Sequence, residues 1–223
     1  MRKFKSFIAL DLKYNAQNIS IVKKLHYHVY GFKVGYRSFY NKRSNDLISE
    51  IKKKKSKLFL DLKLHDIPNT VSSAIDSLSN INPDFLTLHI SGGSEMIKAA
   101  LNSIKKNKLK TKILGVTLLT SLDGKDSNKL YKERNTKKLV KKYAEIANNE
   151  NIHGLVCSGD DLRILAKYNN LIKITPGVKM FARNDDQKRV TFVHNALQDG
   201  ASFVVIGREL IKSKKPLDLL KKY

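Results

Sequence analysis

The stretch FLDLKLHDIPNT, residues 59 to 70, carries four ionisable side chains in what begins as an apolar run. Side chains alternate along a strand, so Asp61, Lys63 and His65 would share one face, and Asp61 and Lys63 could touch. A carboxylate beside an ammonium keeps both groups charged, and such a pair can orient a charged substrate or deliver a proton. Asp66 lies past the strand end, so the strand pattern does not fix its direction.

Other apolar segments also end in polar residues. The polar residues at or just after these segment ends are Asp11, Lys33, His89, Thr120 and the pair Gly207-Arg208. Alone, Asp61 and Lys63 could be a structural ion pair in the core. Together with Lys33 and Asp11 they would be costly in a water-poor site without a use, so the set indicates a functional site.

Eight short apolar segments, often rich in β-branched residues, recur along the chain and fit strands that are buried on both faces. Amphipathic segments at 45–55 and 136–149 predict helices between them, and another helix could start at Asn69 or Thr70. The expected strands are 7–12, 29–35, 57–64, 85–90, 112–119, 153–158, 172–178 and 202–207.

This alternation predicts one (β/α)8-barrel domain over residues 1–223, with an open doubly wound sheet as the alternative. No GxGxxG sequence supports a dinucleotide site. In a barrel, function lies at the C-terminal ends of the strands, where these polar residues fall.

The composition limits the possible partners. The 43 Lys and Arg against 20 Asp and Glu give a net charge of +23, which would attract nucleic acid, membranes or small anions. The lysines are spread over the whole chain, so we expect solvated faces that attract a phosphorylated substrate and no nucleic-acid partner. A nucleic-acid-binding protein stays the alternative from another class, and it would need clustered basic residues and exposed aromatics.

The chain is expected to be cytoplasmic. Its single cysteine, Cys157, excludes an internal disulfide and suits a reducing compartment. No apolar run approaches the roughly 20 residues of a membrane span. The first residues, MRKFKSFIALDL, lack the long apolar stretch of a signal peptide, so no membrane association is expected.

The segment DLKLHDIPNT resembles the D-x-K-x-x-D signature of the orotidine 5'-phosphate decarboxylase family, including its His-Asp-Ile-Pro-Asn-Thr continuation. The likeness extends along the whole chain in the expected order. The further similar segments are IALD (8–11), FKVG (32–35), VTLLTS (116–121), GLVCS (154–158), TPGV (175–178), DQKRV (186–190) and VVIGR (204–208).

The resemblance implies a (β/α)8 homodimer that converts orotidine 5'-monophosphate to uridine 5'-monophosphate and carbon dioxide without a cofactor or metal, the last step of de novo pyrimidine synthesis. By matching motif, Asp11 and Lys33 would hold the ribose hydroxyls. Asp61 would face the scissile carboxylate and Lys63 would donate the proton that replaces it. The implied catalytic residues are Asp61, Lys63, Lys33 and Asp66.

The same resemblance assigns Asp66 and Thr70 to the partner subunit's site and Thr120 to the pyrimidine. The residues implied to bind the phosphate and close the lid are Gln187, Gly207 and Arg208.

Lys179 departs from the family pattern, because bacterial relatives commonly carry arginine after TPGV. A lysine can attract phosphate as a point charge but lacks the planar fork. Whether Lys179 or Arg183 contributes to closure stays open from the sequence. D-x-K-x-x-D alone also occurs in sugar-phosphate enzymes of the same superfamily, often Mg²⁺-dependent, and these are the nearest enzymatic alternative.

Overall fold

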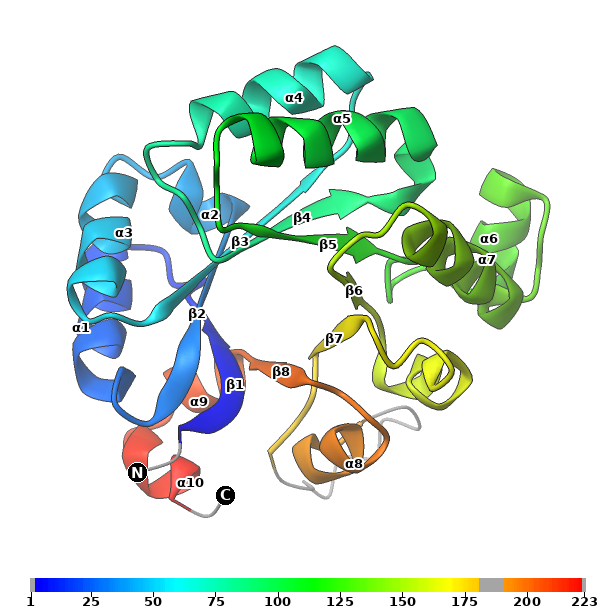
Figure 1. Ribbon diagram of the computed structural model, residues 1–223. Coiled ribbons are helices and arrows are strands. Elements are labelled where there is room, and N and C mark those ends of the chain that lie inside the picture. Colours follow the sequence, from blue (N-terminus) through cyan, green and yellow to red (C-terminus); the bar gives the residue numbers. More distant parts are fainter. Residues whose placement is uncertain (1–2, 181–190, 222–223) are drawn as a thin grey trace.

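The computed structural model describes residues 3–180 and 191–221. Its strands form a closed barrel in which every neighbouring pair is parallel and each strand follows its sequence neighbour (Figure 1). The predicted barrel is therefore confirmed, and the open sheet is excluded. The strands are β1 (Phe4–Ala9), β2 (Val29–Gly35), β3 (Lys57–Leu64), β4 (Phe85–His89), β5 (Lys112–Val116), β6 (Gly154–Val156), β7 (Ile172–Pro176) and β8 (Phe203–Ile206).

Helices cover the outside of the barrel (Figure 1). They are α1 (Asn15–Leu25), α2 (Tyr36–Phe39), α3 (Ser44–Lys53), α4 (Pro68–Ser77), α5 (Ser94–Lys106), α6 (Gly124–Tyr131), α7 (Thr136–Asn149), α8 (Val193–Gln198), α9 (Arg208–Ile211) and α10 (Pro216–Leu220). Short 3-10 helices, η1 (Ile90–Gly92), η2 (Gly159–Asp161) and η3 (Arg163–Leu165), complete the described elements.

The helix predictions are close to the observed bounds. The helix expected at 136–149 is α7, and the one expected at 45–55 is α3. The helix expected from Asn69 or Thr70 starts at Pro68 instead, because a proline at the first helical position has a suitable fixed φ and needs no intrahelical donor. Between β6 and β7 the chain forms η2 and η3 where a barrel usually has an α-helix.

Both faces of the strands are apolar, which explains their nearly continuous hydrophobic runs. Outward-facing residues such as Phe32, Leu60 and Leu86 are buried in one large cluster with the covering helices. Inward-facing residues form a second cluster inside the barrel, made of Phe7, Ala9, Phe59, Phe85, Leu114, Ile174 and Val205.

Aromatic rings fill the barrel interior around Phe7. This ring packs edge-on against four others, with centroid separations between 5.3 and 5.6 Å. The four partners are Tyr30, Phe59, Phe85 and Phe203. Such perpendicular ring contacts add to the stability from area burial. The inner core therefore closes the barrel below the C-terminal strand ends.

Candidate active site

Charged side chains replace the apolar side chains of the inner core at the C-terminal ends of the first strands. Asp11 follows the inward-facing Ala9 by two residues, and Asp61 follows Phe59 in the same way. The period of two along a strand therefore carries the inner face from apolar packing to charge. This is why the apolar run that begins at Phe59 contains a carboxylate.

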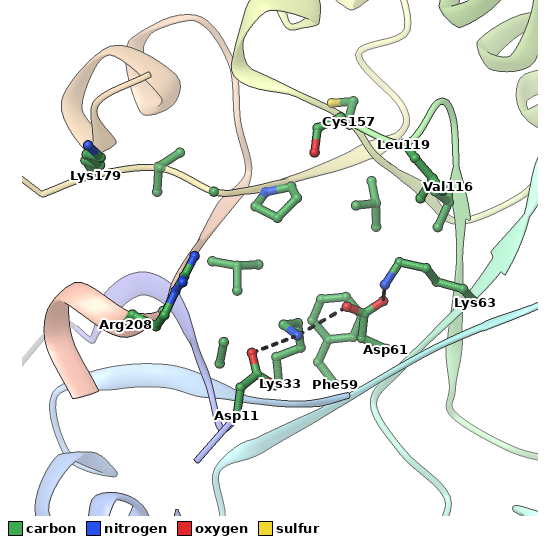
Figure 2. A pocket seen from close by; sticks show the side chains of 18 of the residues that line it. Asp11, Lys33, Phe59, Asp61, Lys63, Val116, Leu119, Cys157, Lys179 and Arg208 are labelled. Atoms are coloured by element: carbon green, nitrogen blue, oxygen red, sulfur yellow. Dashed lines mark hydrogen bonds and ion pairs between the residues drawn. The ribbon is translucent and has the colours of Figure 1, made fainter. Parts of the chain in front are cut away.

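Four charged side chains, Asp11, Lys33, Asp61 and Lys63, form a charged row in which the sign of the charge alternates (Figure 2). Lys33 Nζ lies 3.9 Å from Asp11 Oδ2 and 3.2 Å from Asp61 Oδ2. Lys63 Nζ donates a hydrogen bond of 2.7 Å to Asp61 Oδ1. Asp61 thus binds one ammonium with each carboxylate oxygen, and the expected contact between Asp61 and Lys63 is present.

The environment of Asp61 favours its ionised form. Burial alone would raise the pKa of this carboxyl, but the ammonium groups of Lys33 and Lys63 and their hydrogen bonds outweigh that effect. The net result is a pKa below the ordinary value. Asp61 therefore stays an anion at neutral pH and keeps both lysines in position.

A bulge in β3 aims Lys63. Leu60 pairs with Leu86 of β4, but the next pair is Leu64 with Leu88, so three residues of β3 face one residue of β4. Lys63 has φ of 43°, in the left-handed region that non-glycine residues seldom adopt. Bulges often re-aim a side chain beside an active site.

The bulge also changes the expected face of the strand. Plain alternation placed His65 beside Asp61 and Lys63, but β3 ends at Leu64 and His65 is exposed. The His65 ring lies 5.1 Å from the ring of His89, outside the group of side chains that line the cavity described next.

The charged row forms one wall of a cavity of about 470 Å³ at the C-terminal mouth of the barrel. In Figure 2, Arg208 and Lys179 lie across the cavity from Lys63, with the apolar Val116 and Leu119 along another side. The sequence-predicted residues that line it are Asp11, Lys33, Asp61, Lys63, Thr120, Lys179, Gly207 and Arg208.

The loops after β7 and β8 supply the cationic end of the cavity. Gly177 and Lys179 come from the first loop, and Gly207 and Arg208 come from the second. In (β/α)8 barrels these two loops frequently bind a phosphate group. A ligand with a phosphate could therefore bind with that group at this end of the cavity, opposite Lys63.

Backbone hydrogen bonds fix Lys179. Its N–H donates to Thr191 O at 3.0 Å, and its carbonyl accepts from Val193 N at 2.9 Å. Met180 N donates to the carboxylate of Glu209 at 2.8 Å. The loop after β7 is thereby tied to α8 and α9, which orders the cationic end of the cavity.

The remaining predicted residues fall elsewhere. Asp66 and Thr70 lie in the run 65–70, which is exposed throughout, and neither belongs to the cavity lining. The Asp66 carboxylate accepts a hydrogen bond from Ile67 N at 2.7 Å. Gln187 and Arg183 lie outside the residues that the structure describes.

Some residues at the site carry no sequence signal that we could identify. Glu209 lines the cavity next to Arg208, and Thr87 in β4 forms hydrogen bonds with both Asp61 and Lys63.

Cys157 also belongs to the cavity lining, although its side chain is buried. Burial raises the pKa of this thiol to about 12, so it is a neutral packing group at neutral pH.

Residues 5–223 match the sequence profile described as "Orotidine 5'-phosphate decarboxylase / HUMPS family". The chain belongs to this family. The resemblance seen in DLKLHDIPNT is thus confirmed over nearly the full length.

Relatives named orotidine 5'-phosphate decarboxylase are 37–38% identical to this chain over the aligned residues. The protein of Lawsonia intracellularis is 37% identical over 222 residues, covering 97% of this chain and 96% of its own length. That of Staphylococcus saprophyticus is 38% identical, covering 83% and 82%. These matches place the chain among the decarboxylases of the family, which are carboxy-lyases.

Solved structures agree with this placement. The crystal structure of orotidine 5'-phosphate decarboxylase from Lactobacillus acidophilus is 29% identical, with a TM-score of 0.81. The match covers 99% of this chain and 97% of that one. The orotidine 5'-phosphate decarboxylase family therefore accounts for the barrel as well as for the sequence motifs.

Proposed function

We propose that this protein converts orotidine 5'-monophosphate to uridine 5'-monophosphate and carbon dioxide, without a cofactor, in pyrimidine biosynthesis. The observation that carries the proposal is the row Asp11–Lys33–Asp61–Lys63 facing a cavity with Arg208 at its other end. The relatives that bear this activity in their names support it. The substrate carries a phosphate and a carboxylate, and the cavity offers Arg208 and Lys179 at one end and the ammonium of Lys63 at the other.

The reaction needs charge stabilisation at one ring carbon. The bond from that carbon to the carboxylate breaks, and its electron pair stays on the ring while carbon dioxide leaves. The ammonium of Lys63 stabilises the carbanion and then transfers a proton to the same carbon. Water can reprotonate the amine afterwards. Lys63 thus serves first as a fixed positive charge and then as an acid.

Asp61 has two roles in this proposal. It fixes Lys63 through the 2.7 Å hydrogen bond and favours its charged form. It also faces the substrate carboxylate, a like-charge contact that is relieved when carbon dioxide departs. Lys33 bridges Asp61 and Asp11. By the family resemblance, Lys33 and Asp11 are assigned to the ribose hydroxyls.

The remaining contacts follow the family pattern. Thr120, on the rim beside Leu119, is assigned to the pyrimidine, and the apolar wall would shield the ring from water. Arg208, Gly207 and Gln187 are assigned to the phosphate. Lys179 departs from the family pattern, and we assign it to the same end of the cavity as a point charge that attracts phosphate. Phosphate binding far from the reacting carbon can drive loop closure and organise the charged row.

We further propose that the chain is one domain, works as a homodimer in the cytoplasm and has no nucleic-acid partner. Asp66 and Thr70 would complete the partner subunit's site. The exposure of the whole run 65–70, Ile67 included, supports this arrangement, because a second subunit can reach these side chains. In the described residues, no helix is long and apolar enough to cross a membrane.

An absorbance assay tests the proposal. Purified protein is mixed with orotidine 5'-monophosphate in the presence of a metal chelator, and loss of the orotate chromophore is followed. Turnover under these conditions is the expected result. No turnover with chelator, together with metal-dependent activity on a sugar phosphate, would instead favour the sugar-phosphate enzymes of the superfamily.

A further inference from the structure

Thr87 occupies a special position in β4. It is completely buried and lies between Leu86 and Leu88, whose β3 partners are Leu60 and Leu64. It is therefore the single β4 residue opposite the bulge that contains Asp61 and Lys63. Regular ladder pairing is interrupted at this point, so the backbone groups of the bulge need other partners.

The Thr87 hydroxyl supplies such a partner. Its oxygen accepts a hydrogen bond from Lys63 N at 2.8 Å and donates one to Asp61 Oδ1 at 3.1 Å. The same Asp61 oxygen accepts the 2.7 Å hydrogen bond from Lys63 Nζ. A closed ring results, in which one hydroxyl connects the backbone of Lys63 to the carboxylate that holds its side chain.

The left-handed conformation of Lys63 makes this ring important. A non-glycine residue at φ of 43° costs free energy and persists only where its surroundings fix it. The hydroxyl of Tyr36 holds the preceding peptide from another direction, by donating to Leu62 O at 2.7 Å. Thr87 is the partner that touches both charged members of the pair.

We propose that Thr87 is a positioning residue, which keeps the Lys63 ammonium and the Asp61 carboxylate in the geometry needed for proton transfer. The inference rests on the proposed decarboxylase function and extends it to a residue that has no contact with the cavity. Thr87 acts through Lys63 and Asp61. Its loss should therefore slow the chemical step and leave nucleotide binding largely intact.

Thr87→Val is the direct test, because valine keeps the shape and removes the hydroxyl. We expect kcat to fall by about 10²-fold, the cost of a small misplacement of a catalytic group. KM and the inhibition constant of uridine 5'-monophosphate should change by less than about threefold, because uniform binding is untouched. Thr87→Ser, which restores the hydroxyl, should recover most of the lost kcat.

Thr111→Val is the matched control. Thr111 is also buried, and its hydroxyl donates to Pro83 O at 2.6 Å, but it lies just before β5 at the other end of the barrel. This variant should lose stability without losing kcat. If Thr87→Val does not fold, Thr87→Cys takes its place, because a thiol of similar size is a poor hydrogen-bonding group.

Several results would overturn the inference, and they distinguish a failure of the role of Thr87 from a failure of the proposed function. Wild-type turnover with an equally active Thr87→Val, or Thr87→Cys in its place, refutes the role of Thr87 alone. A rise in KM with unchanged kcat, or a loss that Thr87→Ser does not recover, refutes it in the same way. Absence of wild-type turnover refutes the proposed function and the catalytic role of Thr87 together.

Discussion

Lys63 Nζ and Asp61 Oδ1 are 2.7 Å apart, and a single residue separates Lys63 from Asp61 in the chain. The contact spans a bulge in which Lys63 adopts a positive φ. Groups of the protein itself therefore hold the pair, namely an irregular backbone and the hydroxyl of Thr87. Preorganised charges of this kind need little rearrangement during the reaction.

Lys63→Ala should remove catalysis. Loss of a general acid costs about 10²–10⁴-fold in rate, and loss of the fixed charge adds to this. Binding of uridine 5'-monophosphate should persist, because the phosphate and ribose contacts remain. Lys98→Ala, a change at an exposed lysine of α5, is the control for an altered charge. A folded Lys63→Ala with more than about a tenth of wild-type activity would show that Lys63 is not the proton donor.

Arg208→Ala should act through the phosphate. We expect a higher KM and a partial loss of kcat, because phosphate binding contributes to closure as well as to affinity. A substrate without the 5'-phosphate should be affected little. Arg43→Ala, at an exposed ion pair with Asp46, controls for the lost charge. An equal loss on both substrates would mean that Arg208 has a structural role.

Mixed dimers test whether Asp66 serves the partner's site. Lys63→Ala and Asp66→Ala chains are each expected to be inactive. In a mixed dimer with shared sites, one site carries both lesions and the other carries none. Random pairing makes about half the dimers mixed, so about a quarter of all sites should recover, as the symmetry of an isologous dimer requires. Purified mixed dimers as inactive as both parents would contradict the shared-site proposal.

Acid should weaken the stabilisation that comes from Asp61. Its pKa is lowered in the folded protein, so the ionised carboxylate favours folding above the unfolded pKa of about 3.9. That contribution is lost as the pH falls through the lower, folded pKa. In urea unfolding at pH 7, 5 and 3, the difference in stability between wild type and Asp61→Asn should therefore shrink at pH 3. A constant difference would contradict the pKa shift.

Cys157 should resist alkylation in the native protein. With a pKa of about 12, only about 10⁻⁴ of the thiol is ionised at pH 8, and the thiolate is the reactive form. Mass spectrometry after iodoacetamide treatment should find an unmodified native chain and one modified thiol after unfolding in guanidinium. Equal rates in both states would show that the buried environment does not protect this thiol.

The sequence predicted the barrel because both strand faces are buried and produce recognisable apolar runs. The segment 57–64 was predicted with the bounds of β3, and 136–149 with those of α7. The charged residues at the site were found because Asp61 and Lys63 interrupt such a run. Their contact was predicted from strand alternation, but the structure achieves it with a bulge that alternation does not contain.

Thr87 illustrates what the sequence could not supply. It is one hydroxyl residue in the segment FLTLHI, and its importance comes from the register between β3 and β4. Glu209 is a similar case, because its carboxylate accepts a hydrogen bond from Met180 N and so ties the loop after β7 to α9. Such contacts join residues that are distant in sequence, so no local pattern of residue types reveals them.

The rings packed around Phe7 also determine the path by which ligands can enter and leave the cavity. They fill the barrel beneath the charged row, so the cavity resembles a cup with its opening at the C-terminal mouth. In the proposed reaction, nucleotide, carbon dioxide and the water that restores the lysine proton would all pass through this opening. Leu119 and Thr120 stand at that rim, so product release there is a step separate from the breaking of the bond inside.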